Sequence, residues 1–150
     1  MPDIVLVHPE IPHNTGAIGR LCVGLGWSLH LIRPLGFSLD EKHIRRTGLD
    51  YWQFLDLHIY DTLEDYLAER QPSQLCFMST KAPRSLYDAH IQPNAALLFG
   101  SESCGLPKDF YTRYADSLYQ IPMPGEHARS INLANAVAIT AYEAYRQLLV

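Results

Sequence analysis

The sequence predicts an α/β fold in which helices flank a mostly parallel sheet. Short apolar runs, of the kind that form strands buried on both faces, alternate with segments whose apolar residues recur at helical spacing. Strands that alternate with helices are typical of βαβ units, which build parallel sheets covered on both faces. The 150 residues contain no repeat, low-complexity segment or linker, so we expect a single domain over residues 1–150.

The expected elements of the first half have clear boundaries. A strand covers residues 3–8, and Asn14 or Thr15 can cap the following helix, because short polar side chains accept hydrogen bonds at a helix start. Gly26 ends this helix, since glycine readily adopts the left-handed conformation of a C-cap. The next expected segments are a strand at 28–33, a weakly helical stretch to about residue 50, a strand at 55–60, a helix at 62–70 and a strand at 74–79.

The wholly apolar run of residues 95–99 ends at Gly100, and a Gly-x-Glu-x-x-Gly-Leu-Pro turn follows. Open α/β sheets form their ligand sites where buried strands run into such turns, at the carboxyl ends of the strands. Gly100 and Gly105 allow a tight bend and the close approach of another molecule to the main chain. We therefore expect a small flat ligand at this turn, with a plain strand-to-loop junction as the alternative.

The last expected helix runs from Leu133 to Tyr145, with Ser130 as its N-cap, and it is apolar on nearly all sides. A helix of this kind must be buried nearly all round. In so small a domain, few partners remain within the chain for one of its surfaces. A second subunit is the simplest partner, and a deep core within one chain is the alternative.

Composition and charge restrict the class of protein. Hydrophobic residues make up 47% of the chain and charged residues 19%, which suits a folded domain. No apolar stretch reaches the roughly 20 residues of a membrane helix, and the first residues lack the layout of a signal peptide. The three cysteines are widely spaced, and the histidines lack metal-ligand spacing. We expect a cytoplasmic protein without a membrane span, a disulfide framework or a bound metal.

The local distribution of charge says more about nucleic-acid binding than the net charge of the chain does. The formal net charge is −4, which gives no overall basic footprint. Residues 42–46 (KHIRR) nevertheless place bases just before the aromatic pair at 51–52. This cluster is either a solvated helix face or a surface that contacts phosphates. Lys81, Arg84 and Arg129 extend it only if the fold brings them together.

Three common motifs of ligand sites and active sites have no match or only a loose match in this chain. Residues 100–105 are not a P-loop, because Leu-Pro-Lys follows where Lys-Ser or Lys-Thr is required. The chain contains no Gly-x-Gly-x-x-Gly fingerprint of a dinucleotide site. Ser103 loosely matches the nucleophile of a serine hydrolase, but that fold normally needs a longer chain.

Three sequence blocks together resemble the three motifs of the SPOUT-class RNA 2′-O-methyltransferases. They are residues 9–20 (PEIPHNTGAIGR), residues 99–107 (FGSESCGLP), and residues 121–123 (IPM) followed by 129–138 (RSINLANAVA). The chain length and residues 45–51 (RRTGLDY) resemble the minimal branch, which methylates the tRNA wobble nucleotide. Ala17 departs from the pattern, where Asn is common.

The resemblance implies a fold and a cofactor. It implies a deep trefoil knot at the C-terminal end of the sheet, against the usual expectation of an unknotted chain, and no appended RNA-binding domain. The knotted loops would bind S-adenosylmethionine. The residues that the resemblance assigns to the cofactor are Met78, Gly100, Glu102, Ile121, Met123, Ser130 and Leu133.

The resemblance also implies a substrate and an assembly. Methyl transfer would go to the ribose 2′-hydroxyl of nucleotide 34, a cytidine or modified uridine in the anticodon loop of tRNA. Arg20 is the implied catalytic residue. The last helix, which contains Tyr142, is the implied interface of a homodimer. The residues expected to contact the RNA are Asn14, Arg45, Arg46, Lys81 and Arg129.

Several interpretations stay open at this point. Arg20 either binds a neighbouring phosphate and places the hydroxyl, or accepts its proton transiently in a desolvated site; the first needs no unusual pKa. The same chemistry could act on another tRNA or rRNA site. A non-catalytic RNA-binding or assembly protein could use the same scaffold. Asn14, Arg20, Glu102 and Ser130 at the motif positions favour an enzyme.

Overall fold

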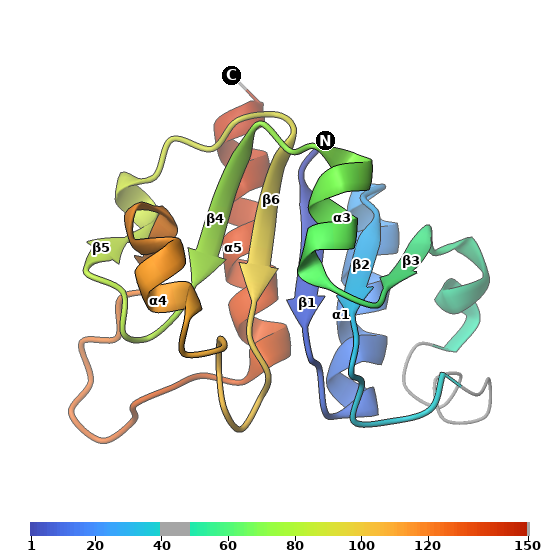
Figure 1. Cartoon of the computed structure of the whole chain (residues 1–150), viewed down its shortest axis with the longest axis horizontal. Coiled ribbons are helices and arrows are strands. Elements are labelled where there is room, and N and C mark those ends of the chain that lie inside the picture. The colour runs from blue at the N-terminus through green and yellow to red at the C-terminus, as the bar shows by residue number, and fades with distance from the viewer. Residues whose placement is uncertain (40–48, 150) are drawn as a thin grey trace.

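The computed structural model describes residues 1–39 and 49–149, and in them it contains one seven-stranded sheet (Figure 1). The strand order is β3-β2-β1-β6-β4-β7-β5, and every neighbouring pair is parallel. This confirms the predicted α/β class. The strands are β1 (Asp3–Val7), β2 (Leu29–Ile32), β3 (Leu57–Tyr60), β4 (Gln74–Met78), β5 (Arg84–Ser85), β6 (Ala95–Phe99) and β7 (Leu118–Gln120).

Helices cover both faces of the sheet. Helices α1 (Pro12–Leu25) and α5 (Leu133–Leu148) lie behind it in Figure 1, and α3 (Leu63–Arg70) and α4 (Phe110–Arg113) lie in front. Three short 3₁₀ helices complete the described part of the chain: η1 (Leu49–Phe54), η2 (Leu86–Asp88) and η3 (Ala115–Ser117). None of the described helices is long and apolar enough to span a bilayer.

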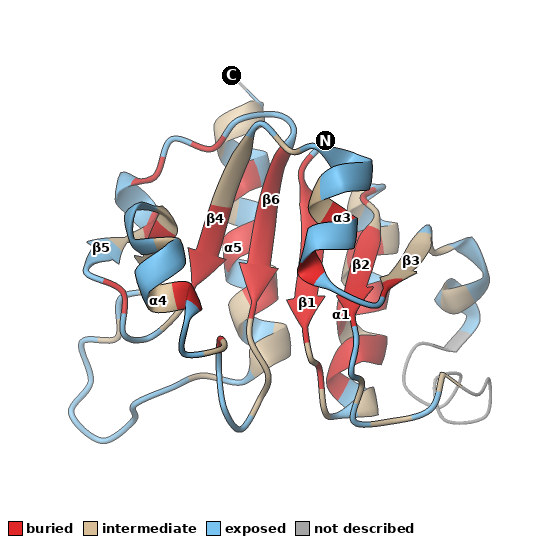
Figure 2. Ribbon diagram, viewed as in Figure 1, coloured by how far each residue is buried: buried red, intermediate tan, exposed pale blue. Residues whose placement is uncertain are grey.

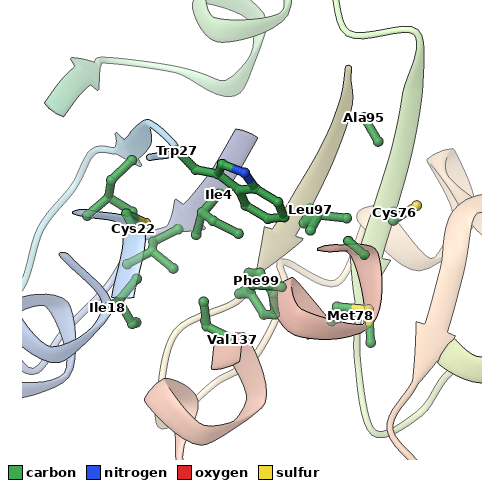
Figure 3. Close-up of a cluster of buried hydrophobic side chains, with 14 of the residues drawn as sticks. Ile4, Ile18, Cys22, Trp27, Cys76, Met78, Ala95, Leu97, Phe99 and Val137 are labelled. Carbon is green, nitrogen blue, oxygen red and sulfur yellow. The ribbon is translucent and has the colours of Figure 1, made fainter. Parts of the chain in front are cut away.

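The central strands β1 and β6 are buried along their whole length (Figure 2). Because side chains alternate along a strand, Ile4 and Leu6 of β1 face one core cluster, while Val5 and Val7 face the other. The first cluster lies against α1 and α5 (Figure 3), and the second against α3 and α4. Burial on both faces explains why these strands are continuous apolar runs.

The prediction that Asn14 or Thr15 caps the first helix is wrong. Helix α1 begins at Pro12, and Ile11 at its N-cap makes no side-chain capping bond. Proline suits the first position, because its fixed φ is helical and its missing N–H would have no partner there. Asn14 and Thr15 lie buried in the first turns instead. The C-cap prediction is confirmed: Gly26 has a φ of 70°.

The last helix begins at Leu133, as predicted, but its N-cap differs from the predicted one. Its N-cap is Asn132 rather than Ser130, because the Asn132 side chain accepts a hydrogen bond from the Asn135 N–H at 3.2 Å. The helix continues to Leu148. One surface of it, with Ile139, Tyr142 and Tyr145, is exposed in the single chain. This exposed surface agrees with the expectation that few partners remain for it within the chain, and the alternative of a deep core within one chain is wrong.

The sequence did not predict strands β5 and β7. They contain only two and three residues and lack an apolar run, so the periodicity of their side chains gives no signal. Both add to the sheet beyond β4, where β7 pairs with β4 and β5 pairs with β7. They therefore set the edge of the sheet beside the functional loops.

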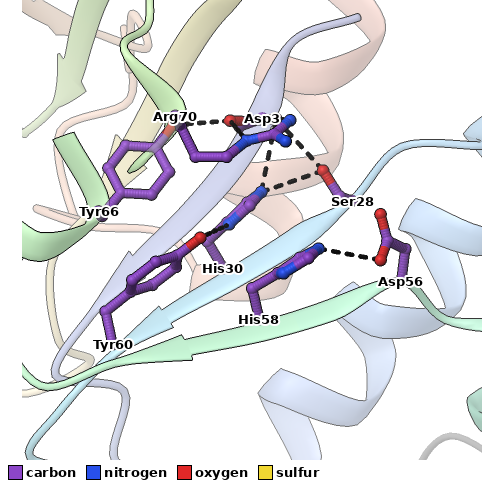
Figure 4. A network of polar contacts seen from close by, with 8 residues as sticks. All are labelled: Asp3, Ser28, His30, Asp56, His58, Tyr60, Tyr66 and Arg70. Carbon is purple, nitrogen blue, oxygen red and sulfur yellow. Dashed lines mark hydrogen bonds and ion pairs between the residues drawn. The ribbon is translucent and has the colours of Figure 1, made fainter. Parts of the chain in front are cut away.

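A buried polar cluster closes the amino-terminal end of the sheet (Figure 4). The carboxylate of Asp3, the first residue of β1, accepts hydrogen bonds from the Tyr66 hydroxyl at 2.8 Å and from Arg70 Nε at 3.0 Å and Nη2 at 2.9 Å. His30 Nε2 lies 3.4 Å from the same carboxylate. Burial alone raises the pKa of Asp3, but the contacts with His30, Arg70 and Tyr66 outweigh it and hold the pKa well below its ordinary value.

This cluster predicts a pH-dependent stability. A carboxyl with a lowered folded-state pKa stabilises the protein above its unfolded pKa of about 3.9, and this contribution is lost as the pH falls below that value. We expect Asp3→Asn to lower the free energy of unfolding by about 1–3 kcal/mol at pH 7, with a smaller difference from the unmutated protein at pH 3. Urea unfolding of both proteins at both pH values measures the difference in the free energy of unfolding.

Asp61→Asn is the matched control for the Asp3 variant. Asp61 forms an ion pair with Arg33 at 2.9 Å, but its side chain is 77% exposed. Exposed pairs of this kind contribute about 0–1 kcal/mol. An Asp3→Asn variant with unchanged stability at pH 7, or with an equal loss of stability at both pH values, contradicts the stabilising role of the Asp3 carboxylate.

Candidate cofactor and RNA site

A pocket of about 530 Å³ opens at the carboxyl ends of β4, β6 and β7, the lower edge of the sheet in Figure 1. Its walls are the loops that follow these three strands, the start of α1 and the first turn of α5. All seven residues expected at the cofactor line it: Met78, Gly100, Glu102, Ile121, Met123, Ser130 and Leu133. Ile11 and Asn14 of the first block also line it, so residues from three separate sequence blocks meet at one cavity.

Glu102 ties the loop after β6 to the start of α1. Its carboxylate accepts hydrogen bonds from the backbone N–H groups of Glu10 at 2.8 Å and Ile11 at 2.7 Å, and from Asn14 Nδ2 at 3.2 Å. A carboxylate at a helix N-terminus also interacts favourably with the helix dipole. Glu102 thus fixes, from a distant loop, the two residues that lead into α1.

The tie between the two loops is reciprocal. The Glu10 carboxylate accepts hydrogen bonds from the Ser103 N–H at 3.0 Å and from the Ser103 hydroxyl at 2.6 Å. These bonds from Ser103 hold the pKa of Glu10 below its ordinary value. Each loop therefore holds the glutamate of the other.

Asn14 extends this network to the third block. Its Oδ1 accepts a hydrogen bond from Asn132 Nδ2 at 3.1 Å, while its own Nδ2 donates to Glu102. Asn14 is buried, with both ends of its amide engaged within the protein. Asn14 was expected to contact the RNA; in this geometry it connects Glu102 to Asn132.

Asn132 is a site residue that was not expected from the sequence. It lies within the third block. Its role as N-cap of α5 is local, whereas its bond to Asn14 depends on a partner 118 residues away. Its polarity just before an apolar helix was the available signal.

Gly100 is required for the tight bend that was expected at this turn. A Cβ at this position would lie 2.1 Å from the carbonyl carbon of Gly105 and 2.3 Å from the N of Leu106. Ser101 and Gly105 also exchange two backbone hydrogen bonds, at 3.1 Å and 2.9 Å, which close the turn. The atoms that lie so close to Gly100 belong to the backbone of residues 105 and 106 of the same chain.

The other end of the pocket carries three polar side chains that follow β4 or lie on α4. The Ser79 Oγ and Tyr111 Oη lie 2.7 Å apart, and Ser79 Oγ also accepts a hydrogen bond from the Lys81 N–H at 3.2 Å. The Lys81 ammonium lies 5.8 Å from the centroid of the Tyr111 ring. All three residues line the pocket. Ser79 and Tyr111 lie outside the three blocks, so no motif pointed to them.

Three of the remaining predicted residues, all within the described part of the chain, lie outside the lining of this pocket. Arg20 is exposed on α1, with its guanidinium 4.8 Å from the centroid of the Tyr51 ring. Arg129 is exposed on the segment before α5, and Tyr142 is half-exposed on α5 itself. Arg45 and Arg46 lie outside the described residues.

Known proteins resemble the chain along its whole length. The family model described as the SpoU rRNA Methylase family matches residues 2–142. A tRNA (cytidine(34)-2'-O)-methyltransferase of Yersinia pestis is 46% identical over 154 residues, which cover 99% of this chain and 94% of that protein. An enzyme of the same name from Aeromonas hydrophila is 44% identical, with 99% and 95% covered.

Solved structures agree in fold. A structure concerning "the 2-OH methylation of C/U34 on tRNA" has a TM-score of 0.92 and 45% identity, and covers 99% of this chain and 97% of that one. The methyltransferase AviRb from Streptomyces viridochromogenes, in complex with the cofactor AdoMet, has a TM-score of 0.82 and 26% identity, and covers 98% and 60%. The family match over most of the chain and the identity with these relatives agree with the resemblance of the three blocks. The chain therefore belongs to the SpoU rRNA methylase family.

Proposed function

We propose that the chain is an S-adenosylmethionine-dependent 2′-O-methyltransferase for the ribose of tRNA nucleotide 34, a cytidine or modified uridine. The observation that carries the proposal is the Asn14 link, which joins Glu102 to Asn132 and so unites the three blocks around one pocket. The names of the relatives at 44–46% identity support this nucleotide as the substrate. With tRNA as the substrate, we place the activity in the cytoplasm.

The pocket fits this cofactor in size and chemistry. Its volume of about 530 Å³ lies within the range of small-molecule sites, which are mostly apolar with a few placed polar groups. Met78, Ile121 and Leu133 can cover the faces of an adenine ring, and the main chain at Gly100 can meet its polar edge. When bound, S-adenosylmethionine supplies an electrophilic methyl group on its sulfonium.

The residues of the chain act on the hydroxyl that receives the methyl group. Arg20 binds the phosphate beside the target ribose, because its planar fork matches phosphate oxygens, and so orients the 2′-hydroxyl toward the pocket. The positive charge of the guanidinium stabilises negative charge on the hydroxyl oxygen as the proton leaves to water. Asn14 and Glu102 hold the loops in place and are positioning residues.

Arg129 is proposed as a further contact with the anticodon loop, together with Arg45 and Arg46. Arg129 is exposed on the segment that leads from β7 to α5, beside the pocket residue Ser130. A cation at this rim contacts the phosphates that flank a nucleotide entering the pocket.

We also propose that the chain forms a trefoil knot. The sheet order supports it, because β7 lies on the far side of β4 from β6, while α5 packs beside α1 and β6. The chain after β7 must therefore cross the sheet edge to reach α5. Residues 121–132 make this crossing at the carboxyl ends of the strands (Figure 1).

The exposed surface of α5 supports a homodimer. Tyr142 and Tyr145 are 50% and 41% exposed, and their rings contact each other edge to face with centroids 6.0 Å apart. Aromatic side chains with this exposure are typical of the central part of protein interfaces. A symmetric two-fold contact is the commonest arrangement for such a surface.

We expect Tyr142→Asp to convert the dimer to a monomer at micromolar concentration, because the new charge would be buried without a partner. Sedimentation velocity measures the change. Tyr87→Asp is the matched control, since Tyr87 is 61% exposed on η2 and should leave the dimer intact. An unmutated protein that sediments as a stable monomer rules out this interface.

Mapping of 2′-O-methyl groups in tRNA tests the function as a whole. The purified protein with S-adenosylmethionine should methylate nucleotide 34 of tRNA that lacks the modification, and cells without the protein should lose it. Methylation at another tRNA or rRNA position identifies a different substrate for the same chemistry. Binding of RNA without methyl transfer identifies a non-catalytic protein and contradicts the proposal.

A further inference from the structure

The pocket contains two charged side chains among the described residues, and they lie on different loops. Glu102 follows β6, and its carboxylate accepts three N–H donors from the start of α1. Lys81 follows β4, and within the described part of the chain its ammonium forms no ion pair. The pocket thus offers one negative charge that is already engaged and one positive charge that is free for a ligand.

The surroundings of Lys81 hold its ammonium at the pocket. The ammonium lies 5.8 Å from the centroid of the Tyr111 ring, within the range of a cation–π interaction. The Tyr111 hydroxyl is fixed in turn by Ser79 Oγ at 2.7 Å, and the Lys81 N–H donates to the same oxygen. A cation–π contact uses none of the three N–H donors of the ammonium, so they remain available to an anion.

The cofactor carries charges of both signs, as the pocket does. The methionine moiety of S-adenosylmethionine carries an α-carboxylate and an α-ammonium group, and the sulfonium carries a further positive charge. A carboxylate is repelled by Glu102 and attracted by Lys81, whereas a sulfonium is attracted by Glu102. We propose, on the basis of the function proposed above, that Lys81 binds the carboxylate of the cofactor's methionine moiety, with Ser79 and Tyr111 as its positioning residues.

This assignment differs from the RNA contact that the sequence analysis gave to Lys81. An ammonium binds a phosphate or a carboxylate equally well as a point charge, so its type alone does not choose between them. The position of Lys81 does choose between them. Lys81 lines the same cavity as Met78, Gly100 and Leu133, whereas Arg20 and Arg129 lie outside the lining. The pocket therefore favours a group of the cofactor over a phosphate of the RNA.

Two ligands that differ in the methionine moiety test the assignment. S-adenosylhomocysteine contains the amino-acid carboxylate, and 5′-methylthioadenosine has the same adenosine and sulfur without it. We expect Lys81→Met to weaken S-adenosylhomocysteine binding about fivefold or more, as for a partly exposed charge pair, and to leave 5′-methylthioadenosine binding within about twofold. Lys81→Arg should retain most of the affinity. Isothermal titration calorimetry measures both Kd values without any need for turnover.

Lys108→Met is the matched control, because Lys108 is exposed on the far side of the 101–106 loop and does not line this pocket. It should leave both Kd values unchanged. Unchanged S-adenosylhomocysteine binding in Lys81→Met, with weaker tRNA binding, assigns Lys81 to the RNA and overturns the inference. Equal weakening of both ligands indicates a distorted pocket and also overturns it. If neither ligand binds the unmutated protein, the proposed function itself is wrong, which is a distinguishable outcome.

Discussion

Replacement of Arg20 by alanine should lower the rate of methyl transfer by about a hundredfold or more while leaving cofactor affinity nearly unchanged. A ribose 2′-hydroxyl is a poor nucleophile near neutral pH, and loss of a group that positions it costs roughly this factor. Arg20 lies outside the lining of the cofactor pocket, so its truncation removes no contact there. Single-turnover methylation at saturating tRNA and calorimetry with S-adenosylhomocysteine measure the two quantities.

Two further variants make the Arg20 experiment specific. Arg20→Lys should restore little activity, because a point charge does not reproduce the planar fork of the guanidinium. Arg113→Ala is a suitable control, since Arg113 is half-exposed on α4 and pairs with Asp109 and Glu64 on the surface. Near-normal methylation by Arg20→Ala at saturating tRNA would falsify both the positioning role and the role as a base.

Replacement of Gly100 by valine should abolish cofactor binding and also destabilise the protein. The new Cβ would meet the backbone of Gly105 and Leu106 at 2.1–2.3 Å, and no choice of side-chain rotamer moves a Cβ. The turn must open, which displaces the wall of the pocket and costs about 1–3 kcal/mol, as for other overpacked sites. Calorimetry with S-adenosylhomocysteine and urea unfolding measure the two effects.

Gly24→Ala separates this clash from a general effect of adding a methyl group. Nothing lies within 4 Å of a Cβ at Gly24, inside α1, so this variant should be neutral or more stable by about 0.5–1 kcal/mol. A folded Gly100→Val protein with unchanged affinity contradicts the placement of the cofactor at this turn. A variant with lost affinity and full stability indicates that the turn has room which the structure does not show.

Much of the fold could be predicted because its signals are local. The strand at residues 95–99, the helix end at Gly26 and the helix at 62–70 all appear within one or two residues of their predicted positions. Each follows from burial or capping that neighbouring residues in the sequence reveal. The short strands β5 and β7 gave no such signal, since they exist only as additions to β4.

The seven expected cofactor residues came from the family resemblance, six of them from the second and third blocks and Met78 from outside the blocks, and the pocket lining contains all of them. The partners of the polar residues could not be predicted in the same way. Asn14 was expected to cap a helix and to contact RNA, and Gly100 to meet a ligand. Ser79 and Tyr111 stand outside every motif, and only the packing of α4 near the end of β4 brings them together.

By itself, the sequence determined the alternation of strands and helices, the burial of β1 and β6 and the identity of the three blocks, because hydrophobic periodicity and motif spacing are properties of short segments. Only the tertiary structure decided which groups these blocks bind. Glu102 lies 88 residues from Asn14, and Asn132 lies 118 residues from it, yet the three form one hydrogen-bonded chain. A buried polar group must find a partner wherever the fold offers one, so its choice depends on the order of strands in the sheet and not on its neighbours in sequence.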